Sequence, residues 1–100
     1  MGSSLDDLKN FPLEARRDAG YSLDMVQRGS MPSDFKPMKT VGAGVYEIRT
    51  HVQGEWRIIY VAKFNNTIYV LHAFQKKTQK TKQSDLDLAK QRYQQIRGES

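Results

Sequence analysis

The sequence of 100 residues contains no cysteine, so neither a disulfide scaffold nor a thiolate metal site is possible. This composition fits a reducing cytoplasm. The longest apolar runs have the length of a strand and are interrupted by charge, and no basic segment followed by an apolar segment opens the chain, so we expect neither a membrane span nor an export signal. The two histidines and the scattered acids show no ligand spacing, and we therefore expect no metal and no other cofactor.

Positive charge is in excess only in the second half of the chain. Residues 1–44 carry six basic and six acidic side chains, whereas residues 45–100 carry ten basic and five acidic ones. The segment 75–83 has no acid and holds Lys76, Lys77, Lys80 and Lys82. Such a cluster would bind polyphosphate with a strong dependence on salt, although a lysine-rich loop is often only solvated.

Residues 45–81 predict three consecutive antiparallel strands. Asn65-Asn66 suits a two-residue turn with positive φ at both central residues, so Phe64 should face Thr67. The ladder then continues outward through Ala62 with Tyr69, Val61 with Val70, Tyr60 with Leu71, Ile59 with His72, Ile58 with Ala73 and Arg57 with Phe74.

The strand over residues 45–52 has an apolar side, carrying Ile48, and a polar side, carrying Arg49. A three-residue connection, either Val52-Gln53-Gly54 or Gln53-Gly54-Glu55, brings its apolar side next to Ile58 and Tyr60. Arg49 then lies beside Arg57 or Ile59. The alternation therefore predicts one sheet face that carries Arg49, Arg57, His72 and Lys76. The alternative interpretation is a solvated sheet face that collects charges.

Helices are expected on both sides of these strands in the sequence. Ser4 can cap a short helix containing Leu5 and Leu8, and Pro12 suits the first turn of a second helix that ends at Gly29. In that second helix the apolar stripe consists of Ala15, Ala19, Leu23 and Val26. The last helix, capped by Ser84 and ended by Gly98, offers Leu86, Leu88, Ala89, Tyr93 and Ile96 as apolar contacts.

These elements predict a single α+β domain over residues 1–100, with a helical hairpin packed on a small twisted antiparallel sheet and with a C-terminal helix. The helical layer is expected on the face of Ile58, Tyr60 and Leu71. Residues 30–44 contain two prolines and two glycines and are expected to form a loop.

Several segments, in this order, resemble the RelE/HigB toxins, and in particular the phage-derived Gp49-like branch of the RelE/ParE superfamily. The segments that carry the resemblance are Ser4 to Leu8, Met31 to Asp34, Gly44 to Arg49, Trp56 to Tyr60, Leu71 to Thr81 and the helix start from Asp85 to Arg92. The resemblance covers nearly the whole chain and implies a RelE-like fold. Members of this branch usually open with a strand before the first helix, whereas here only Met1-Gly2-Ser3 precedes it, so we expect one sheet edge to lack its usual neighbour.

The resemblance implies the toxin of a type II toxin–antitoxin system, a ribosome-dependent mRNA endoribonuclease that inhibits translation in the cytoplasm. It also implies a HigA-like helix-turn-helix antitoxin as partner, together with mRNA and the ribosome with its rRNA. The sheet arginine of the family corresponds to Arg57, its basic residue after the last long strand to Lys76 or Lys77, and its first-strand arginine to Arg49. Glu47 occupies a position where the family has a helper lysine.

The residue types suit RNA cleavage without a metal, which needs a proton acceptor, a proton donor and charge near the phosphorane-like transition state. Arg57 and Lys76 are the candidates for the phosphate. His72 is the candidate general acid or base, because histidine is the residue type most often used for proton transfer near neutral pH, and His51 is the weaker alternative. Arg49, Lys77, Lys80 and Lys82 are candidates for binding RNA. Tyr93 is a candidate for base stacking, although an aromatic residue on a helix more often belongs to the core, and His72 can equally be a sheet histidine bonded to a neighbour.

Three functions compete at this point. The first is the translation-dependent mRNA endonuclease. The second is a catalytically silent module that binds RNA or an antitoxin. The third is a ParE-like inhibitor of gyrase, which the basic sheet face disfavours.

Overall fold

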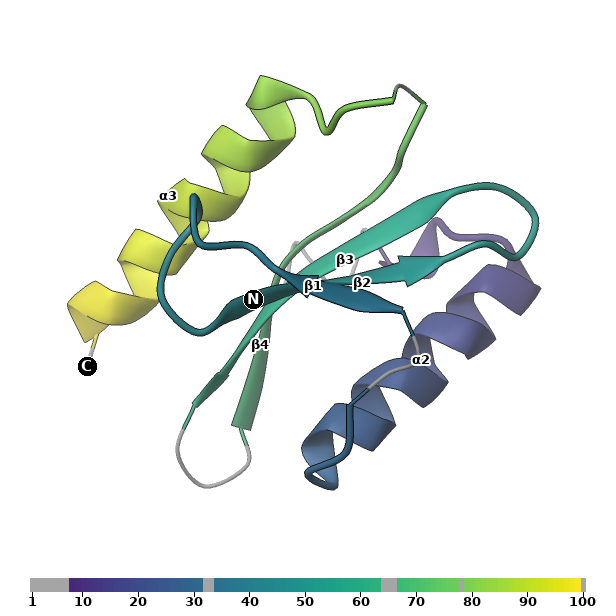
Figure 1. Ribbon diagram of the computed structural model, residues 1–100, viewed down its shortest axis with the longest axis horizontal. Helices are drawn as coiled ribbons and strands as arrows, with labels where there is room; N and C mark the ends of the chain where they lie inside the picture. The colour runs from purple at the N-terminus through teal and green to yellow at the C-terminus, as the bar shows by residue number, and fades with distance from the viewer. Residues whose placement is uncertain (1–7, 32–33, 64–66, 78, 100) are drawn as a thin grey trace.

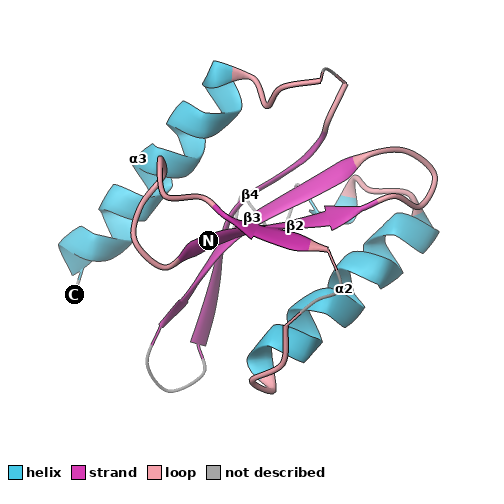
Figure 2. Ribbon diagram, viewed as in Figure 1, coloured by secondary structure: helices cyan, strands magenta, loops and turns pink. Residues whose placement is uncertain are grey.

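The computed structural model describes residues 8–31, 34–63, 67–77 and 79–99 (Figure 1). Four strands form one antiparallel sheet in the order β1-β2-β3-β4, and Figure 2 shows this sheet between two helices. The elements are α2 (Leu13–Gln27), β1 (Phe35–Pro37), β2 (Val45–Thr50), β3 (Trp56–Lys63), β4 (Thr67–Gln75) and α3 (Gln83–Glu99). The predicted α+β class is confirmed.

Helix α2 follows the predicted stripe. It begins directly after Pro12, and Ala15 and Ala19 are completely buried against the sheet. Gly29 follows the helix with φ of 87°, a backbone conformation that favours glycine. Of the first predicted helix, Leu8 is helical, whereas Ser4 and Leu5 lie outside the described residues, as do Met1-Gly2-Ser3.

Strand β1 lies within the segment that we expected to be a loop, and that prediction was wrong for three residues. Phe35 pairs with Ile48 and Pro37 pairs with Tyr46, so β1 adds a fourth strand beside β2. A strand of three residues is too short to show an alternating pattern, and its proline is a residue typical of loops. Proline lacks the N–H needed inside a sheet, and it is tolerated here because β1 is an edge strand.

The β2–β3 hairpin has the register of the Val52-Gln53-Gly54 alternative. Arg49 pairs with Arg57, and the ladder ends at the pair of Thr50 with Trp56. The turn uses two residues with positive φ, Gln53 at 57° and Gly54 at 127°. The predicted proximity of the two arginines is therefore confirmed.

The β3–β4 ladder follows the predicted register only in its first half. Arg57 pairs with Phe74 and Ile59 pairs with His72 as expected, but Tyr60 then pairs with Val70. The predicted pairs of Tyr60 with Leu71, Val61 with Val70 and Ala62 with Tyr69 were wrong, because a bulge makes Leu71 an extra residue in β4. Thr67 pairs with Lys63 rather than with Phe64, and the turn residues 64–66 lie outside the described part of the chain.

Two apolar clusters occupy opposite faces of the sheet, as the positions of α2 and α3 in Figure 1 show. One contains Ile58 and Tyr60 and packs against α2, whereas the other contains Ile59 and Leu71 and packs against α3. The prediction of one helical layer on the face of Ile58, Tyr60 and Leu71 was therefore wrong. The bulge explains the position of Leu71, since it turns this residue to the same side as its neighbour His72, where Ile59 and Val61 also contribute to the cluster with α3.

Helix α3 begins one residue before the predicted cap, at Gln83, and the carbonyl of Lys82 accepts the first backbone bonds. Ser84 therefore lies inside the first turn, and Gly98 lies inside the helix instead of ending it. The buried residues Ala89, Tyr93 and Ile96 form the contact with the sheet, as predicted. Within the described ranges, no helix is long and apolar enough to cross a membrane.

Candidate functional site

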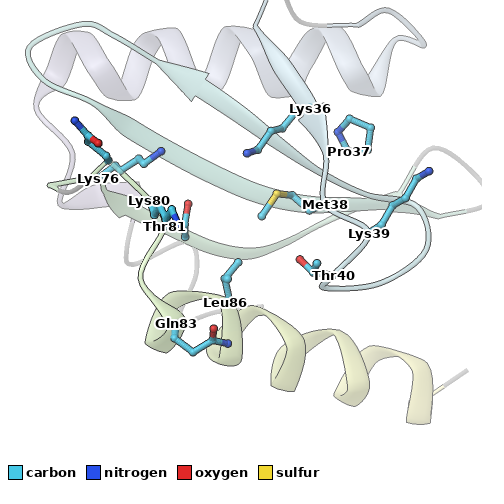
Figure 3. Close-up of a pocket in the computed structure, with 11 residues that line it drawn as sticks. Lys36, Pro37, Met38, Lys39, Thr40, Lys76, Lys80, Thr81, Gln83 and Leu86 are labelled. Carbon is cyan, nitrogen blue, oxygen red and sulfur yellow. The ribbon is translucent and has the colours of Figure 1, made fainter.

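A groove lined by lysine side chains runs between the sheet edge at β1 and the start of α3 (Figure 3). It has a volume of about 760 Å³, and its described lining includes no acid but four lysines, Lys36, Lys39, Lys76 and Lys80. Figure 3 shows Lys36 and Lys76 extending toward each other from opposite walls. The groove therefore concentrates positive potential where an extended chain of phosphates would fit.

A smaller cleft of about 190 Å³ adjoins this groove and shares Lys76 and Gln79 with it. The other residues of its lining are Glu55, just before β3, and Arg57, on β3. A ligand that lies along the lysines therefore comes within reach of Arg57 at the place where β4 ends.

The side chain of Arg57 is only 6% exposed, and three contacts hold it in position. Its Nη1 donates to the carbonyl of Trp56 at 3.0 Å, its Nη2 donates to Glu55 at 3.3 Å, and its Nε lies 3.8 Å from Glu47. A guanidinium has five N–H groups, so each terminal nitrogen has a second N–H beyond these bonds. The group is fixed, and it can still donate to a phosphate.

Arg57 is part of a closed circle of alternating acidic and basic side chains, which we call the ionic ring. Its members are, in order, Asp34, Arg49, Glu47, Arg57, Glu55 and His51. Arg49 Nε lies 3.4 Å from Glu47, which is completely buried, and Arg49 Nη1 lies 3.8 Å from Asp34. The ring closes at His51, whose Nε2 and Nδ1 lie 2.5 Å from Asp34 and 2.6 Å from Glu55.

The hydrogen bonds within the ring change the pKa of two exposed groups. The bond with Asp34, followed by the bond with Glu55, raises the pKa of His51 above its ordinary value of 6.5. The bond with His51, helped by the bond from Arg57, lowers the pKa of the Glu55 carboxyl below 4.5. At neutral pH Glu55 is therefore ionised, and the imidazolium form of His51 can donate from both nitrogens.

His72 is near the ionic ring in the sheet but in a different environment. It is 7% exposed, its Nε2 lies 2.8 Å from Asp85 of α3, and its ring stacks on Phe74 with centroids 4.8 Å apart. It is not among the residues that line the groove or the cleft. The observed contact joins the sheet to α3, and the catalytic role of His72 stays a prediction.

The position of Tyr93 favours the alternative given above, a core residue, over base stacking. The residue is 8% exposed, and its hydroxyl donates to the carbonyl of Ala43 at 2.9 Å. Its ring lies so close to Gly42 that a Cβ there would be 2.3 Å from a ring carbon. Tyr93 is thus a core residue that fastens α3 to the segment before β2.

The other predicted RNA-binding residues are divided among three environments. Lys80 lines the groove, Arg49 belongs to the ionic ring, and Lys77 and Lys82 are exposed and outside the lining of both hollows. Sequence reasoning missed Lys36 and Lys39, because the segment that carries them was expected to be a loop without a fixed place beside the sheet. It also missed Glu55, although its position two residues before Arg57 was a usable signal.

The arrangement combines a positive groove with a cleft in which an arginine, a lysine and an ionised carboxylate meet. Such a cleft can hold a phosphodiester, stabilise charge on it and accept a proton. In the described segments, no group of three His, Asp or Glu side chains is arranged to hold a metal ion.

Comparison with known proteins agrees with the resemblance seen in the sequence. Residues 6–94 match the model of the family described as phage derived protein Gp49-like (DUF891). No curated protein matches the sequence.

Proposed function

Because this chain belongs to the phage derived protein Gp49-like family, which is toxin-like, we propose that it is the toxin of a type II toxin–antitoxin system. Its activity would be cleavage of mRNA on the ribosome, which stops translation. Wider relatedness to the RelE/HigB toxins is part of this proposal.

The observation that carries the proposal is the continuity of the lysine groove with the Arg57 cleft. Single-stranded RNA is bound through its phosphates by basic grooves, and cleavage requires that one phosphate also meets positioned donors. In this structure Lys76 belongs to both hollows. An RNA backbone along Lys36 and Lys80 would bring a phosphate to Lys76 and Arg57.

The chemistry follows from these positions. The 2′-hydroxyl of the ribose attacks the adjacent phosphorus, and the bond from phosphorus to the 5′-oxygen breaks. Arg57 is fixed by three contacts, so its remaining N–H groups would meet the negative charge that develops on the phosphoryl oxygens without reorganising. Lys76, which lines the same cleft, would supply the proton to the departing 5′-oxygen.

The decisive experiment adds the purified protein to a translating extract and maps cuts in a reporter mRNA. We expect cuts within the codon in the ribosomal A site, and Arg57→Lys should reduce the rate about 100-fold, because the planar fork of donors is lost while the charge stays. Arg17→Lys is the matched control, since Arg17 is an exposed arginine of α2 that pairs with Glu14. Intact mRNA in the presence of folded wild-type protein would contradict the proposal.

The proposed partner is a helix-turn-helix antitoxin of HigA type. Expression of the chain alone should arrest growth, and coexpression with such an antitoxin should restore it. Growth without arrest, at a verified level of folded protein, would count against the toxin assignment.

One observation favours a second function, a module that binds RNA without cutting it. Both arginines of the ionic ring contact carboxylates, Glu47 in each case, which reduces the positive potential available to RNA there. RNA binding that depends on Lys36 and Lys80, with no cleavage in the translating extract, would support this function over the first.

A further inference from the structure

Glu55 is the acidic residue in the described lining of the small cleft. It stands beside Arg57, and its side chain is 46% exposed, so a ligand in the cleft can reach it. Its backbone carbonyl accepts a hydrogen bond from the backbone N–H of Lys76 at 2.7 Å. This bond fixes the backbone of Glu55 relative to the backbone of Lys76, so the two side chains enter the cleft from neighbouring positions.

The two carboxylate oxygens of Glu55 have separate partners. Oε1 accepts from Arg57 Nη2 at 3.3 Å, and Oε2 lies 2.6 Å from Nδ1 of His51. The other ring nitrogen of His51 is bonded to Asp34, so the imidazole is held at both ends. Because its ring is held on both sides, His51 fixes the orientation of the Glu55 carboxylate.

We propose that Glu55 is the proton acceptor for the 2′-hydroxyl of bound RNA and that His51 is its positioning residue. This proposal rests on the proposed function, and it names a base for the same site. His72, the general acid or base predicted from the sequence, is bonded to Asp85 of α3 and does not line the cleft, whereas Glu55 does.

The step balances without any further reactant. The 2′-O–H proton moves to Glu55 as the 2′-oxygen forms its bond to phosphorus, and the departing 5′-oxygen takes a proton from the Lys76 ammonium. The products are a 2′,3′-cyclic phosphate and a 5′-hydroxyl end. Proton exchange with water then returns Glu55 to the carboxylate and Lys76 to the ammonium.

The pH dependence of this step is set by the charged groups around Glu55. His51 from the β2–β3 turn, Arg57 from β3 and Lys76 from the end of β4 face the carboxylate, while Asp34 and Glu47 lie behind His51 and Arg57. The bond with His51 is the largest cause of the lowered pKa of Glu55. Loss of His51 should therefore move the acid limb of the cleavage rate to higher pH.

The test measures single-turnover cleavage of ribosome-bound mRNA between pH 4 and pH 8. Glu55→Gln should lower the rate about 100-fold or more, the usual contribution of a general base. Binding of a short RNA with a 2′-deoxy residue at the cleavage site should stay within about threefold of wild type, because the lysines of the groove are unchanged. Glu14→Gln, an exposed ion-paired carboxylate on α2, is the matched control and should cleave at the wild-type rate.

The role of His51 is tested by His51→Gln, which should shift the acid limb of the cleavage rate to higher pH. The role of Glu55 is tested further by Glu55→Asp, which keeps a carboxylate and should recover part of the rate lost in Glu55→Gln. If wild type cleaves and Glu55→Gln cleaves equally fast, the proposal for Glu55 is overturned and the proposed function stands. If His51→Gln leaves the pH profile unchanged, the positioning role is overturned. If the wild-type protein binds the probe and never cleaves mRNA, the proposed function fails first, and this inference fails with it.

Discussion

The two faces of the sheet differ in how far a helix covers them. Helix α2 packs against both β2 and β3, and the face beneath it is apolar, with Phe11 and Trp56 in ring contact at 4.4 Å. Helix α3 packs chiefly against β4, and beneath it lie Ile59 and Leu71. The ionic ring lies on that second face around β2 and β3, so its members are paired with one another instead of with a helix. Alternation along a strand assigns a residue to a face, but the position of the helix decides whether the residue belongs to a core or to a site.

The largest loss in the free energy of unfolding should come from a substitution on the apolar face beneath α2. Trp56→Ala removes a side chain that is 8% exposed together with its contact to Phe11. We expect a loss of about 4 kcal/mol in the free energy of unfolding, measured by urea denaturation. Val52→Ala, at an exposed residue of the neighbouring turn, is the control and should change stability by less than about 0.5 kcal/mol. A loss below about 1 kcal/mol for Trp56→Ala would show that this face is not the main core.

The next largest loss in the free energy of unfolding should come from a substitution in the ionic ring on the other face. Glu47→Ala leaves the buried guanidinium of Arg57 without its buried carboxylate and should cost about 3 kcal/mol. The double variant Glu47→Leu with Arg57→Met should recover most of this stability, because an apolar pair of similar volume needs no compensation. It should nevertheless lose cleavage. Full cleavage by the double variant would show that the ionic ring is structural only.

Substitutions at two glycines should have opposite effects on stability, since one glycine is closely packed and the other lies in a helix with free space around it. Gly42→Ala places a Cβ 2.3 Å from the Tyr93 ring, and this overpacking beside α3 should cost about 2 kcal/mol. Gly20→Ala on α2 meets nothing within 4 Å and should stabilise the protein by about 0.7 kcal/mol through helix propensity. Thermal unfolding of the two variants tests the pair. Equal shifts of the two melting temperatures would contradict the contact between Tyr93 and Gly42.

The smallest effect on the free energy of unfolding should be its dependence on pH through the titration of His51. Because its pKa is raised in the folded state, its stabilising contribution is fully present below about pH 6.5 and is lost as the pH rises through the folded pKa. The residue is half exposed, so solvent screening keeps this contribution below about 1 kcal/mol. Urea midpoints at pH 6 and pH 9 should therefore differ more for wild type than for His51→Gln. The same difference in both proteins would exclude His51 as the cause.

Much of the fold follows from local patterns in the sequence. The α2 stripe and the pairing of Arg49 with Arg57 were predictable, because each depends on a period or on a turn that the sequence displays. The bulge at Leu71 was not, since an extra residue in a strand leaves no mark when both its neighbours are also apolar or aromatic. That bulge moved Leu71 to the face of Ile59 and Val61, where α3 packs.

The candidate site was predictable in part for the same reason. Arg57 and Lys76 do meet at one cleft, because alternation and register bring them together. Lys36 depended on a short edge strand that no pattern indicates, and Glu55 depended on the conformation of the turn around Gly54. Contacts made by turns and edges require the tertiary structure.

The bulge also has a consequence for the surface of the protein. Among the described strands, β4 has a neighbour on one side only, and a regular edge of nine residues would offer a template for another chain. The extra residue interrupts that template, and the carbonyl of Leu71 is occupied by Arg92 Nη1 at 2.8 Å. The irregularity that places Leu71 beneath α3 therefore also discourages edge-to-edge aggregation along β4.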